Sequence, residues 1–563
     1  MLQLTKSPLF CPATREIKGM SCDRPKISFL CNDLNEIQLQ RIYSKNSKIN
    51  ATVIDGFKAV TKELEMPSMV DSGLGIGISN FFEGKNIFLT GGTGLLGKVL
   101  VEKMLRSTPL GKIYVLIKAD NPKAAWDRLF KELINSELFG CIQEKHGKCY
   151  QEFIKEKVIP IVGNICEPNL GMDLDSARAI MEDVNVIIES AAITTLNERY
   201  DLLLDTNVNG PQRLMRFAKS CKNLELLVHI STVYVNGEKE GIILEEPLTM
   251  GENRRNGNGE ICLPLDVSDE INLALRSCKA TSNYDTTKDM KRLGMERAKS
   301  YGWYNTYHLT KAMAEMVIHE TRGDIPVLII RPSVIESCYR EPYPGWIQGN
   351  RMFDPIIISY GKGQLPAFLG KPDTPMDVIP LDMAVNTTIA AIAKHGKMHK
   401  PEINVYHLAS DLVNPLRYSQ FFEYIRDYFT SEPLIQSETF TRINYYDDLK
   451  SIKYFDNFDE FSSYTRDEIN ERFGGKTNQI KIQKQCKAKA AYAENLCKMY
   501  EFLGFFKARF DVGNTQKLLS EMSIEEKNSF AVDVREINWR KYFQEIHIPG
   551  LRKHVLNDKR ISL

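Results

Sequence analysis

The sequence predicts an α/β protein with a doubly wound parallel sheet and a smaller, mainly helical C-terminal domain. Three observations predict it. Six short apolar runs have the composition of buried strands, and helical stretches separate them, an alternation that is typical of parallel sheets. A glycine-rich turn joins the first predicted strand to a helix. Polar residues follow the ends of the other strands, where ligands bind in sheets of this class.

The glycine-rich turn is the most specific of these features. The apolar run Ile87 to Leu89 is followed at once by T-G-G-T-G-L-L-G, and apolar residues then recur at helical spacing up to Met104. Glycines three residues apart permit a tight turn, close approach of the backbone to a pyrophosphate and close packing of helix on strand. The helix N-terminus offers N–H groups to the phosphates. We therefore predict a dinucleotide site at Thr90, Gly91, Gly92, Thr93, Gly94, Leu95, Leu96 and Gly97.

Five further strands complete the predicted sheet: Ile113–Ile117, Val158–Val162, Val186–Ile188, Leu226–Ile230 and Val327–Ile330. Because ligands bind at the carboxyl ends of such strands, residues near these ends are further candidates for the cofactor site. They are Lys118, Asn164, Ile165, Ala191, Asn207, Pro332 and Ser333, with Asn207 in the helical stretch before the fifth strand.

The tip of the second strand bears on the identity of the cofactor. An acidic side chain about 20 residues past the glycines usually binds the ribose hydroxyls of NAD. This chain has Lys118 at the tip, and an ammonium group suits a 2′-phosphate, whereas Asp120 just beyond it favours the opposite choice. We predict NADPH as the cofactor. The alternative interpretation of Lys118 is a solvated strand end.

Three residues form a candidate catalytic set for the reduction of a carbonyl group. Tyr307 and Lys311 are four residues apart in a helix-like run and share one helix face, and Thr232 follows the fifth strand. A tyrosine phenol is a weak acid at neutral pH, and a nearby ammonium is expected to lower its pKa. The Thr232 hydroxyl can hydrogen-bond the same carbonyl oxygen as negative charge develops there. Tyr307 and Lys311 are also expected to contact the cofactor.

Two neighbouring side chains are alternatives to members of this set. Ser231 is the alternative to Thr232. His308 is a candidate general base, but it is expected to point away from the face of Tyr307 and Lys311 and to be packed or exposed. A Y-x-x-x-K pattern alone is common, so the six ordered strands and the glycine loop carry most of the argument. No metal site is predicted.

Length, charge and cysteine content narrow the class of protein. The 563 residues suggest more than one domain, and a formal net charge of +1 gives no support to nucleic-acid binding. No apolar run is long enough to span a bilayer, so a lipid substrate must be met from water or at a membrane surface. The 12 cysteines are scattered without a C-x-x-C pair, as in reduced intracellular proteins.

Residues 1–80 differ in composition from the rest of the chain. Residues 1–31 hold five Lys and Arg residues against Glu16 and Asp23 and have no long apolar core, which fits an organelle transit peptide rather than a secretory signal. A disordered or family-specific extension is the alternative. The glycine-rich residues 71–80 are predicted to be a linker.

The glycine loop, Ser231-Thr232 and the pair Tyr307 and Lys311 resemble those of an extended short-chain dehydrogenase/reductase. Further motifs resemble the fatty acyl-CoA reductase family, and with the N-terminal extension the chain most resembles its plastid, male-sterility-type branch in plants. The family usually has arginine where this chain has Lys118, and lysine lacks the bidentate fork of arginine. The match runs from about Phe81 to the C-terminus, in N-E-R-Y-D (197–201), T-N-V-N-G (206–210), H-I-S-T-V-Y-V-N-G (229–237), Y-H-L-T-K-A-M-A-E (307–315), R-P-S (331–333), E-P-Y-P-G-W (341–346) and D-V-I-P-L-D-M (377–383).

The resemblance implies an NADPH-dependent enzyme that reduces a long-chain fatty acyl thioester, carried by CoA or acyl carrier protein, to a primary alcohol through an aldehyde. It implies a plastid location, with the cytosol or the surface of the endoplasmic reticulum as alternatives. Four regions follow: transit peptide and linker, largely disordered, at 1–80; the NADPH-binding catalytic domain at 81–410; a connecting region at 411–490; and the C-terminal domain at 491–563. Acyl chain length, release of aldehyde and oligomeric state are left open.

For three regions outside these motifs, the sequence predicts the function less specifically. Residues 247–300, with an evident loop at 256–259, form a lid or a solvated insertion. Lys481, Lys484 and Lys487 share one side of a probable helix, which docks an acidic carrier or CoA phosphates or is simply solvated. Residues 336–410 hold many prolines and glycines and few clear helices, and in the family this part helps to form the acyl site.

Two other functions compete with acyl reduction. The first is another NADP-dependent enzyme of the extended family, one that reduces a small ketone or aldehyde or epimerises a nucleotide sugar, and the extra C-terminal domain argues against it. An acyl reductase that releases aldehyde is a variant of the main hypothesis. The second is a cofactor sensor without chemistry, which has no need of Thr232, Tyr307 and Lys311.

Overall fold

The computed structural model describes residues 75–251, 262, 264–280, 285–434, 451–474 and 480–558, all within one compact unit. The predicted transit peptide and the loop at 256–259 lie outside the described residues. The end of the predicted linker lies inside them, and it is docked. The N–H groups of Ile76, Gly77 and Ile78 all donate to the carboxylate of Glu526, at 2.6–2.8 Å, just where helix α3 (Ile78–Phe82) begins.

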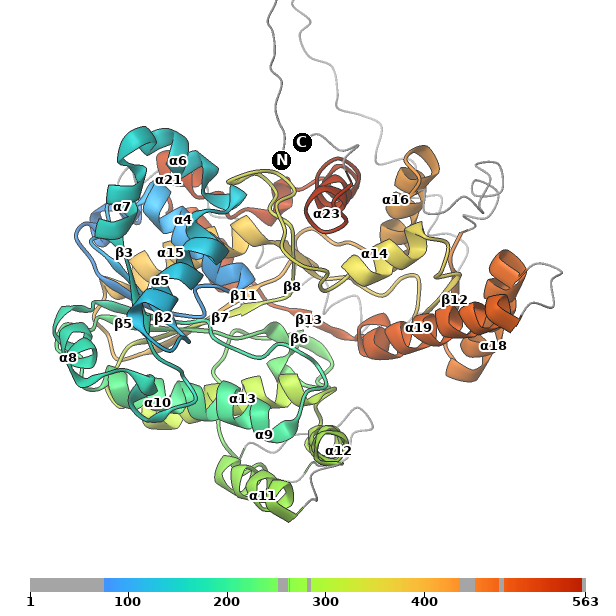
Figure 1. The fold of residues 1–563 in the computed structure, drawn as a ribbon, viewed down its shortest axis with the longest axis horizontal. Helices are drawn as coiled ribbons and strands as arrows, with labels where there is room; N and C mark the ends of the chain where they lie inside the picture. The colour runs from blue at the N-terminus through green and yellow to red at the C-terminus, as the bar shows by residue number, and fades with distance from the viewer. Residues whose placement is uncertain are drawn as a thin grey trace, which may run out of the picture. The chain divides into compact units, whose positions relative to one another are not determined.

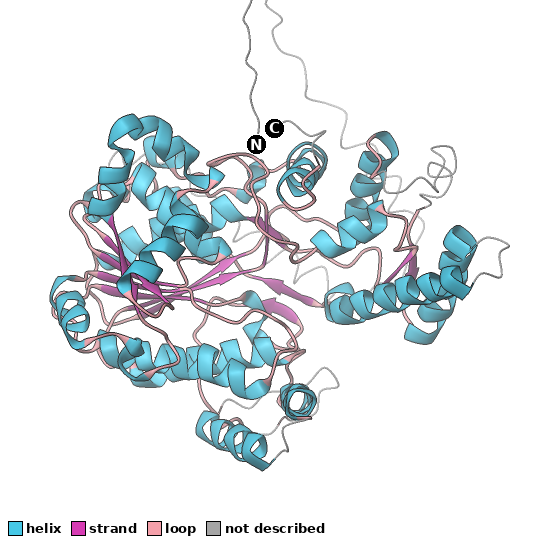
Figure 2. Cartoon of the chain, in the orientation of Figure 1, coloured by secondary structure: helices cyan, strands magenta, loops and turns pink. Residues whose placement is uncertain are grey.

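The centre of the fold is a seven-stranded sheet in which every neighbouring pair is parallel (Figure 2). Its order is β11-β7-β5-β4-β1-β2-β3. The chain runs outward from β1 to β3 and then returns to the other side of β1, so the winding reverses between β1 and β4. The strands are β1 Ile87–Thr90, β2 Ile113–Ile117, β3 Val158–Val162, β4 Val186–Glu189, β5 Leu226–Ile230, β7 Val327–Pro332 and β11 Ile403–Leu408.

All six predicted strands are present, and the doubly wound α/β class is confirmed. The seventh strand, β11, was not predicted. Its sequence, INVYHL, has no uninterrupted apolar run, because it lies at the edge of the sheet and its first two residues are only half-buried. Its remaining residues are buried because of their place in the sheet, and the sequence has no apolar pattern that indicates this burial.

Helices cover both faces of the sheet, with α4, α5 and α15 on one face and α8, α10 and α13 on the other (Figure 1). Strand β1 shows why its sequence is continuously apolar. Ile87 and Leu89 pack in the core that contains Leu100 and Met104 of α4, whereas Phe88 packs against Phe217 of α10 on the opposite face. A strand buried on both faces has no polar alternation.

The helices of the described residues are α3 Ile78–Phe82, α4 Leu95–Ser107, α5 Pro122–Leu129, α6 Gly140–His146, α7 Tyr150–Lys157, α8 Leu174–Asp183, α9 Tyr200–Leu204, α10 Gly210–Ala218, α11 Val267–Ala280, α12 Thr286–Ser300, α13 Thr306–Thr321, α14 Asp354–Gly361, α15 Leu381–Gly396, α16 Tyr418–Ser431, α18 Phe458–Ile469, α19 Ile480–Gly504, α20 Gly513–Glu521, α21 Ile524–Ser529, α22 Trp539–Lys541 and α23 Ile548–His554. None of them is long and apolar enough to cross a membrane.

Three short parallel pairs extend the fold beyond the main sheet. They are β8 (Val334–Glu336) with β10 (Val378–Pro380), β9 (Ala367–Leu369) with β12 (Lys453–Phe455), and β6 (Gly241–Ile243) with β13 (Ala508–Phe510). The last pair joins the segment after β5 to the C-terminal region through a backbone ladder. The boundary predicted at 490/491 falls inside α19, a single continuous helix.

The expectation of few helices between residues 336 and 410 is wrong. Helices α14 and α15 both lie there, and α15 is buried along nearly its whole length. A helix that is buried on all sides has no polar face and therefore no amphipathic stripe to reveal it. Two parts of the stretch interpreted as a lid or an insertion form helices beside α9 and α13: Val267–Ala280 is α11 and Thr286–Ser300 is α12.

Candidate functional site

The glycine loop between β1 and α4 has the tight backbone that the sequence predicts. Gly91 has a φ of 72°, and a Cβ there would lie 2.6 Å from the backbone of Ser190. A Cβ on Gly97 would lie 2.3 Å from the carbonyl oxygen of Gly91. Larger residues are therefore excluded at both positions, because a backbone atom cannot move aside as a flexible side chain can.

The N-terminus of α4 is open to an anion. Gly94 is the N-cap residue, and no side chain among the described residues caps the helix there. Thr90 fixes the neighbouring strand end, because its Oγ1 accepts from the N–H groups of Ser190 and Ala191 at 3.2 and 3.3 Å. Uncapped N–H groups and a positive dipole end fit the pyrophosphate of a dinucleotide, so the residues present fit a nicotinamide cofactor.

The end of β2 presents two cations rather than one. Lys118 and Asp120 are both exposed. Arg128 of α5 reaches back to this strand end, donating to the carbonyl oxygen of Lys118 at 3.0 Å and to Thr93 Oγ1 at 3.4 Å. Sequence reasoning missed Arg128, because it lies on the next helix. The signal for it was a cation ten residues beyond the strand tip.

The other predicted cofactor residues form the walls of this edge of the sheet. Asn164 closes a turn through Glu167 and Cys166, and Ile165 packs beside Gly210 of α10. Pro332 and Ser333 follow β7, and the Ser333 N–H donates to Leu408 O at 2.9 Å. A direct contact of any of these residues with a cofactor stays a prediction.

Asn207 is fully buried and its amide is already engaged. Its Oδ1 accepts from the Ile193 N–H at 2.9 Å, and its Nδ2 donates to Ile193 O at 3.0 Å and to Thr310 Oγ1 at 3.2 Å. These bonds tie the loop after β4 to helix α13. Asn207 therefore positions the two elements that frame the site.

The three predicted catalytic residues lie on two adjoining elements, the end of β5 and helix α13. The Ser231 hydroxyl donates to Glu315 Oε1 of α13 at 2.5 Å, and the Tyr234 ring stacks on His308 with centroids 5.2 Å apart. Thr232 thus lies between two residues that contact the helix bearing Tyr307 and Lys311. Its own hydroxyl donates to Pro332 O at 3.3 Å. Since Ser231 is engaged with Glu315, Thr232 is the better candidate for a substrate contact.

The electrostatics of the pair Tyr307 and Lys311 differ from the sequence-based expectation. Burial, and secondarily the charge of Glu189, raises the pKa of Tyr307 above its usual range. The expected lowering of the Tyr307 pKa by Lys311 is wrong in this structure. Burial lowers the pKa of Lys311, and the carboxylates of Glu189 and Glu315 oppose that effect. The phenol therefore stays protonated at neutral pH, as a proton donor must.

Glu189 was not predicted. It ends β4 and is 1% exposed, and its Oε2 lies 2.5 Å from Nδ1 of the buried His229, a contact without the geometry of a hydrogen bond. Burial favours the protonated carboxyl, but Lys311 and His229 outweigh it and lower the Glu189 pKa. An acid at the end of an apolar strand was the signal for this residue.

Helix α13 rests on a second buried charge pair. The Arg331 guanidinium donates to both Glu315 oxygens, at 2.9 and 2.5 Å, and both side chains are 0% exposed. Arg331 also lies 3.1 Å from His407 Nε2, and His407 Nδ1 lies 2.9 Å from the carbonyl oxygen of Asp511. The catalytic helix is thus linked to the C-terminal region through buried polar side chains.

The aromatic cluster of the C-terminal region packs beside the catalytic helix. Phe502, Phe506 and Phe510 contact the Tyr234 ring with centroids 5.5–6.0 Å apart. His308, predicted to be packed or exposed, is packed: it is 2% exposed, and burial lowers its pKa to about 3. A small cavity of about 10 Å³ adjoins this cluster, lined by Tyr234, Phe353, Met376, Leu503, Phe506 and Phe510 among others.

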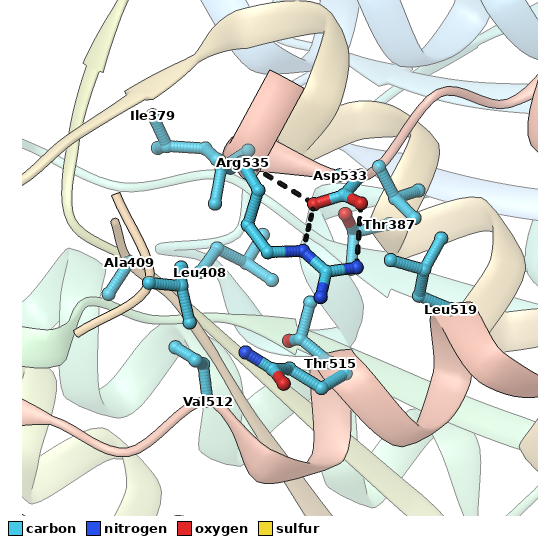
Figure 3. Close-up of a pocket in the computed structure, with 13 residues that line it drawn as sticks. Ile379, Thr387, Leu408, Ala409, Val512, Thr515, Leu519, Asp533 and Arg535 are labelled. Carbon is cyan, nitrogen blue, oxygen red and sulfur yellow. Dashed lines mark hydrogen bonds and ion pairs between the residues drawn. The ribbon is translucent and has the colours of Figure 1, made fainter. Parts of the chain in front are cut away.

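A second small cavity, of about 20 Å³, lies between α15, the end of β11 and α20 (Figure 3). Apolar residues such as Ile379, Leu408 and Leu519 line it, and Arg535 pairs with Asp533 at 2.7 and 2.8 Å across one side. Neither the glycine loop nor the catalytic residues line this cavity, so it is separate from the candidate active site.

Comparisons with known proteins agree with this geometry. Two family models described as "Male sterility protein" match the chain, an NAD-binding model at residues 89–388 and a second model at residues 463–558. "Fatty acyl-CoA reductase 2, chloroplastic" of Arabidopsis thaliana is 43% identical, over 96% of this chain and 91% of its own length. "Alcohol-forming fatty acyl-CoA reductase" of Simmondsia chinensis is 36% identical, over 85% of this chain and 99% of its own length.

A solved structure supports the fold. The terminal R domain from the myxalamid PKS-NRPS biosynthetic pathway superposes with a TM-score of 0.54 at 16% identity, over 84% of this chain and 91% of its own. At that identity the likeness concerns the fold alone. Together with the family models and the identity to two named reductases, these findings place the chain. It belongs to the fatty acyl-CoA reductase family of the male-sterility type.

Proposed function

We propose that this chain is an oxidoreductase that reduces a long-chain fatty acyl thioester, carried by CoA or acyl carrier protein, to a primary alcohol through an aldehyde. The observation that carries the proposal is the set Thr232, Tyr307 and Lys311, held at the end of β5 and on α13. Family membership supports acyl chemistry, since the alcohol-forming relative is matched over 99% of its length.

The cofactor that we propose is NADPH, with the glycine loop and the N-terminus of α4 around its pyrophosphate. When bound, it supplies hydride to the carbonyl carbon of the substrate. Lys118 and Arg128 at the end of β2 would hold the 2′-phosphate, because Arg128 reaches both Thr93 of the loop and the Lys118 backbone. Two cations favour a phosphate over the free hydroxyl of NADH.

Thr232 and Tyr307 would bind the carbonyl oxygen of the substrate, and Tyr307 would supply its proton. Thr232 would exchange its hydrogen bond to Pro332 O for one to the substrate oxygen, and Tyr307 would donate the second bond. The buried phenol, with its raised pKa, then gives a proton to the oxygen of the aldehyde. Hydride addition to the thioester would put negative charge on that oxygen, and the hemithioacetal would then break its C–S bond, releasing the carrier thiol and leaving the aldehyde. Reduction of the aldehyde develops charge on the same oxygen, so one pair of donors would serve both reductions.

Lys311 completes the set from one helical turn beyond Tyr307. Its ammonium interacts with Glu189 and Glu315, whose carboxylates oppose the lowering of the Lys311 pKa by burial. A charge there would stabilise the phenolate that forms when Tyr307 gives up its proton. The same ammonium would hold the ribose of the cofactor.

The acyl chain would lie against the aromatic cluster of the C-terminal region. The small cavity beside Tyr234 is lined mainly by apolar and aromatic side chains, and the Tyr234 ring that lines it stacks on His308, next to Tyr307. At about 10 Å³ it has room for about one water, so the side chains around it would have to move apart to admit an acyl chain. Asp377 and Asp411 also line it, and they would face the polar end of the substrate.

The carrier and the compartment are open to direct test. We propose a plastid location, because the relative matched over 96% of this chain is named chloroplastic. A fluorescent fusion to residues 1–80, imaged in plant cells, would accumulate in plastids. Uniform cytosolic fluorescence would reject that location without touching the chemistry. Lys481, Lys484 and Lys487 are exposed on α19 and remain candidates for docking an acidic carrier.

The deciding experiment is product identification. The purified full chain is incubated with NADPH or NADH and either palmitoyl-CoA or palmitoyl-acyl carrier protein, and lipid products are identified by mass. Primary alcohol formed with NADPH is the expected result, and the faster carrier names the physiological donor. Aldehyde without alcohol would retain the first reduction and reject the second. No product from either carrier, with NADPH still bound, would reject the proposal.

A further inference from the structure

A second cluster of ionisable side chains is buried away from the catalytic residues. Glu336 ends β8, Asp354 begins α14 and His547 ends η9 (Tyr542–His547), and all three side chains are 0% exposed. His547 Nε2 lies 3.2 Å from Asp354 Oδ1 and 3.7 Å from Glu336 Oε2. All three atoms lie within 4.8 Å of one another.

The three atoms that face one another have no hydrogen-bond partner in the described part of the chain. The opposite atom of each side chain is held. Glu336 Oε1 accepts from the Phe353 N–H at 3.0 Å, and Asp354 Oδ2 accepts from the Arg351 N–H at 2.9 Å. His547 Nδ1 lies 3.0 Å from Ser337 Oγ. The outer bonds aim three unpaired ligand atoms at one point.

Burial makes this arrangement costly without a cation. Two carboxyl groups in a dry interior need either a neutralising proton or a compensating positive charge, and no lysine or arginine of the described residues pairs with Glu336 or Asp354. Each carboxylate has a hydrogen bond on its outer oxygen, but its inner oxygen has none. Buried polar atoms rarely lack a hydrogen-bond partner.

We propose that Glu336 Oε2, Asp354 Oδ1 and His547 Nε2 bind a divalent transition-metal ion. One imidazole nitrogen and two carboxylate oxygens suit Zn²⁺, Mn²⁺ or Fe²⁺. The charge of such an ion cancels that of the two carboxylates. Ligand atoms of a tetrahedral zinc site lie about 3.4 Å apart, close to the 3.2 and 3.7 Å found here, and water would complete the coordination.

The ion would join the two regions that the family models match separately. Glu336 and Asp354 belong to the region at 89–388, and His547 belongs to the region at 463–558. The outer shell crosses the same boundary, because the Tyr542 hydroxyl donates to Ser337 O at 2.8 Å. The ion would have a structural role, and its loss is expected to destabilise the packing of the C-terminal region before it affects the chemistry.

Metal content of the full chain, purified without a polyhistidine tag or chelators, tests the proposal. Mass spectrometry of the elements is expected to find about one equivalent of zinc, manganese or iron per chain. His547→Gln and Asp354→Asn are each expected to lose it. His395→Gln is the matched control, because His395 is also buried but its imidazole bonds the Tyr406 hydroxyl, at 2.9 Å, and it should keep the metal.

A second measurement does not depend on the variants folding. The wild-type chain is stripped with a chelator and titrated with Co²⁺, which is expected to give visible absorption that saturates at about one equivalent and to raise the Tm. Reloading with Zn²⁺ or Mn²⁺ should restore the Tm of the untreated protein. Absence of metal from the purified chain, with no absorption and no Tm rise on titration, would overturn the proposal and assign a shared proton to the cluster.

Discussion

The cofactor side and the catalytic side of the site are assembled in different ways. On the cofactor side, one short stretch supplies the strand end, the glycine loop and the helix N-terminus, and its contacts are mostly local. On the catalytic side, Glu315 bonds Ser231 and Arg331, and Arg331 leads through His407 to Asp511. The difference teaches that the glycine loop is built by a local motif, whereas the position of Tyr307 depends on packing that reaches into the C-terminal region.

The largest effect on the rate is expected for a substitution at Tyr307. Tyr307→Phe removes the proton donor and should lower kcat by about 10²–10⁴-fold while NADPH binding persists. Tyr304→Phe is the control, because Tyr304 is three residues earlier and stacks on Phe502 from outside the catalytic set. Single-turnover rates and cofactor titration separate the two sides. A Tyr307→Phe rate close to that of Tyr304→Phe would remove Tyr307 from the mechanism.

The next largest effect is expected for the buried ion pair that supports helix α13. Glu315→Gln leaves the Arg331 guanidinium fully buried without its charge partner and should lower the free energy of unfolding by about 3–5 kcal/mol. Glu182→Gln breaks an exposed pair with Lys222 and should cost less than about 1 kcal/mol. Urea unfolding measures both. Equal losses in the two variants would contradict the importance given to the buried network.

The same contrast between local motifs and long-range packing explains which features can be predicted from the sequence. All six strands, the loop at Thr90–Gly97 and the helix of Tyr307 and Lys311 follow from local patterns, and the structure has each of them. Strand β11 and helix α15 were missed because tertiary burial, not an amphipathic pattern, defines them. Glu189 and Arg128 were missed because their roles come from neighbours on other elements. The wrong sign for the Tyr307 pKa has the same origin, since burial is invisible in sequence.

The cofactor side gives a smaller and more selective effect. Arg128→Ala removes the guanidinium beside Thr93 and Lys118 and should lower kcat/KM for NADPH by about 10- to 100-fold, with little change for NADH. Arg178→Ala, an exposed arginine on α8, is the control. Steady-state rates with each cofactor measure the ratio. Parallel loss with NADPH and NADH would mean that Arg128 only holds the loop in shape.

The remaining effect shows only as a change of stability with pH, and it concerns a carboxyl that joins the catalytic side to the C-terminal region. Glu245 accepts from the N–H groups of His407 and Asn514 at 2.7 and 2.6 Å, yet burial outweighs these bonds and raises its pKa to about 8. Between its usual pKa near 4.5 and about 8, the folded chain therefore holds a proton that the unfolded chain has released. Folding must take up that proton, so stability from this group falls as pH rises through the window. Glu245→Gln is neutral throughout, and its urea midpoint relative to wild type should rise from pH 5 to pH 8 and then level off. A constant difference would show that Glu245 is ionised in the folded protein, and that the backbone N–H groups, rather than burial, set its charge.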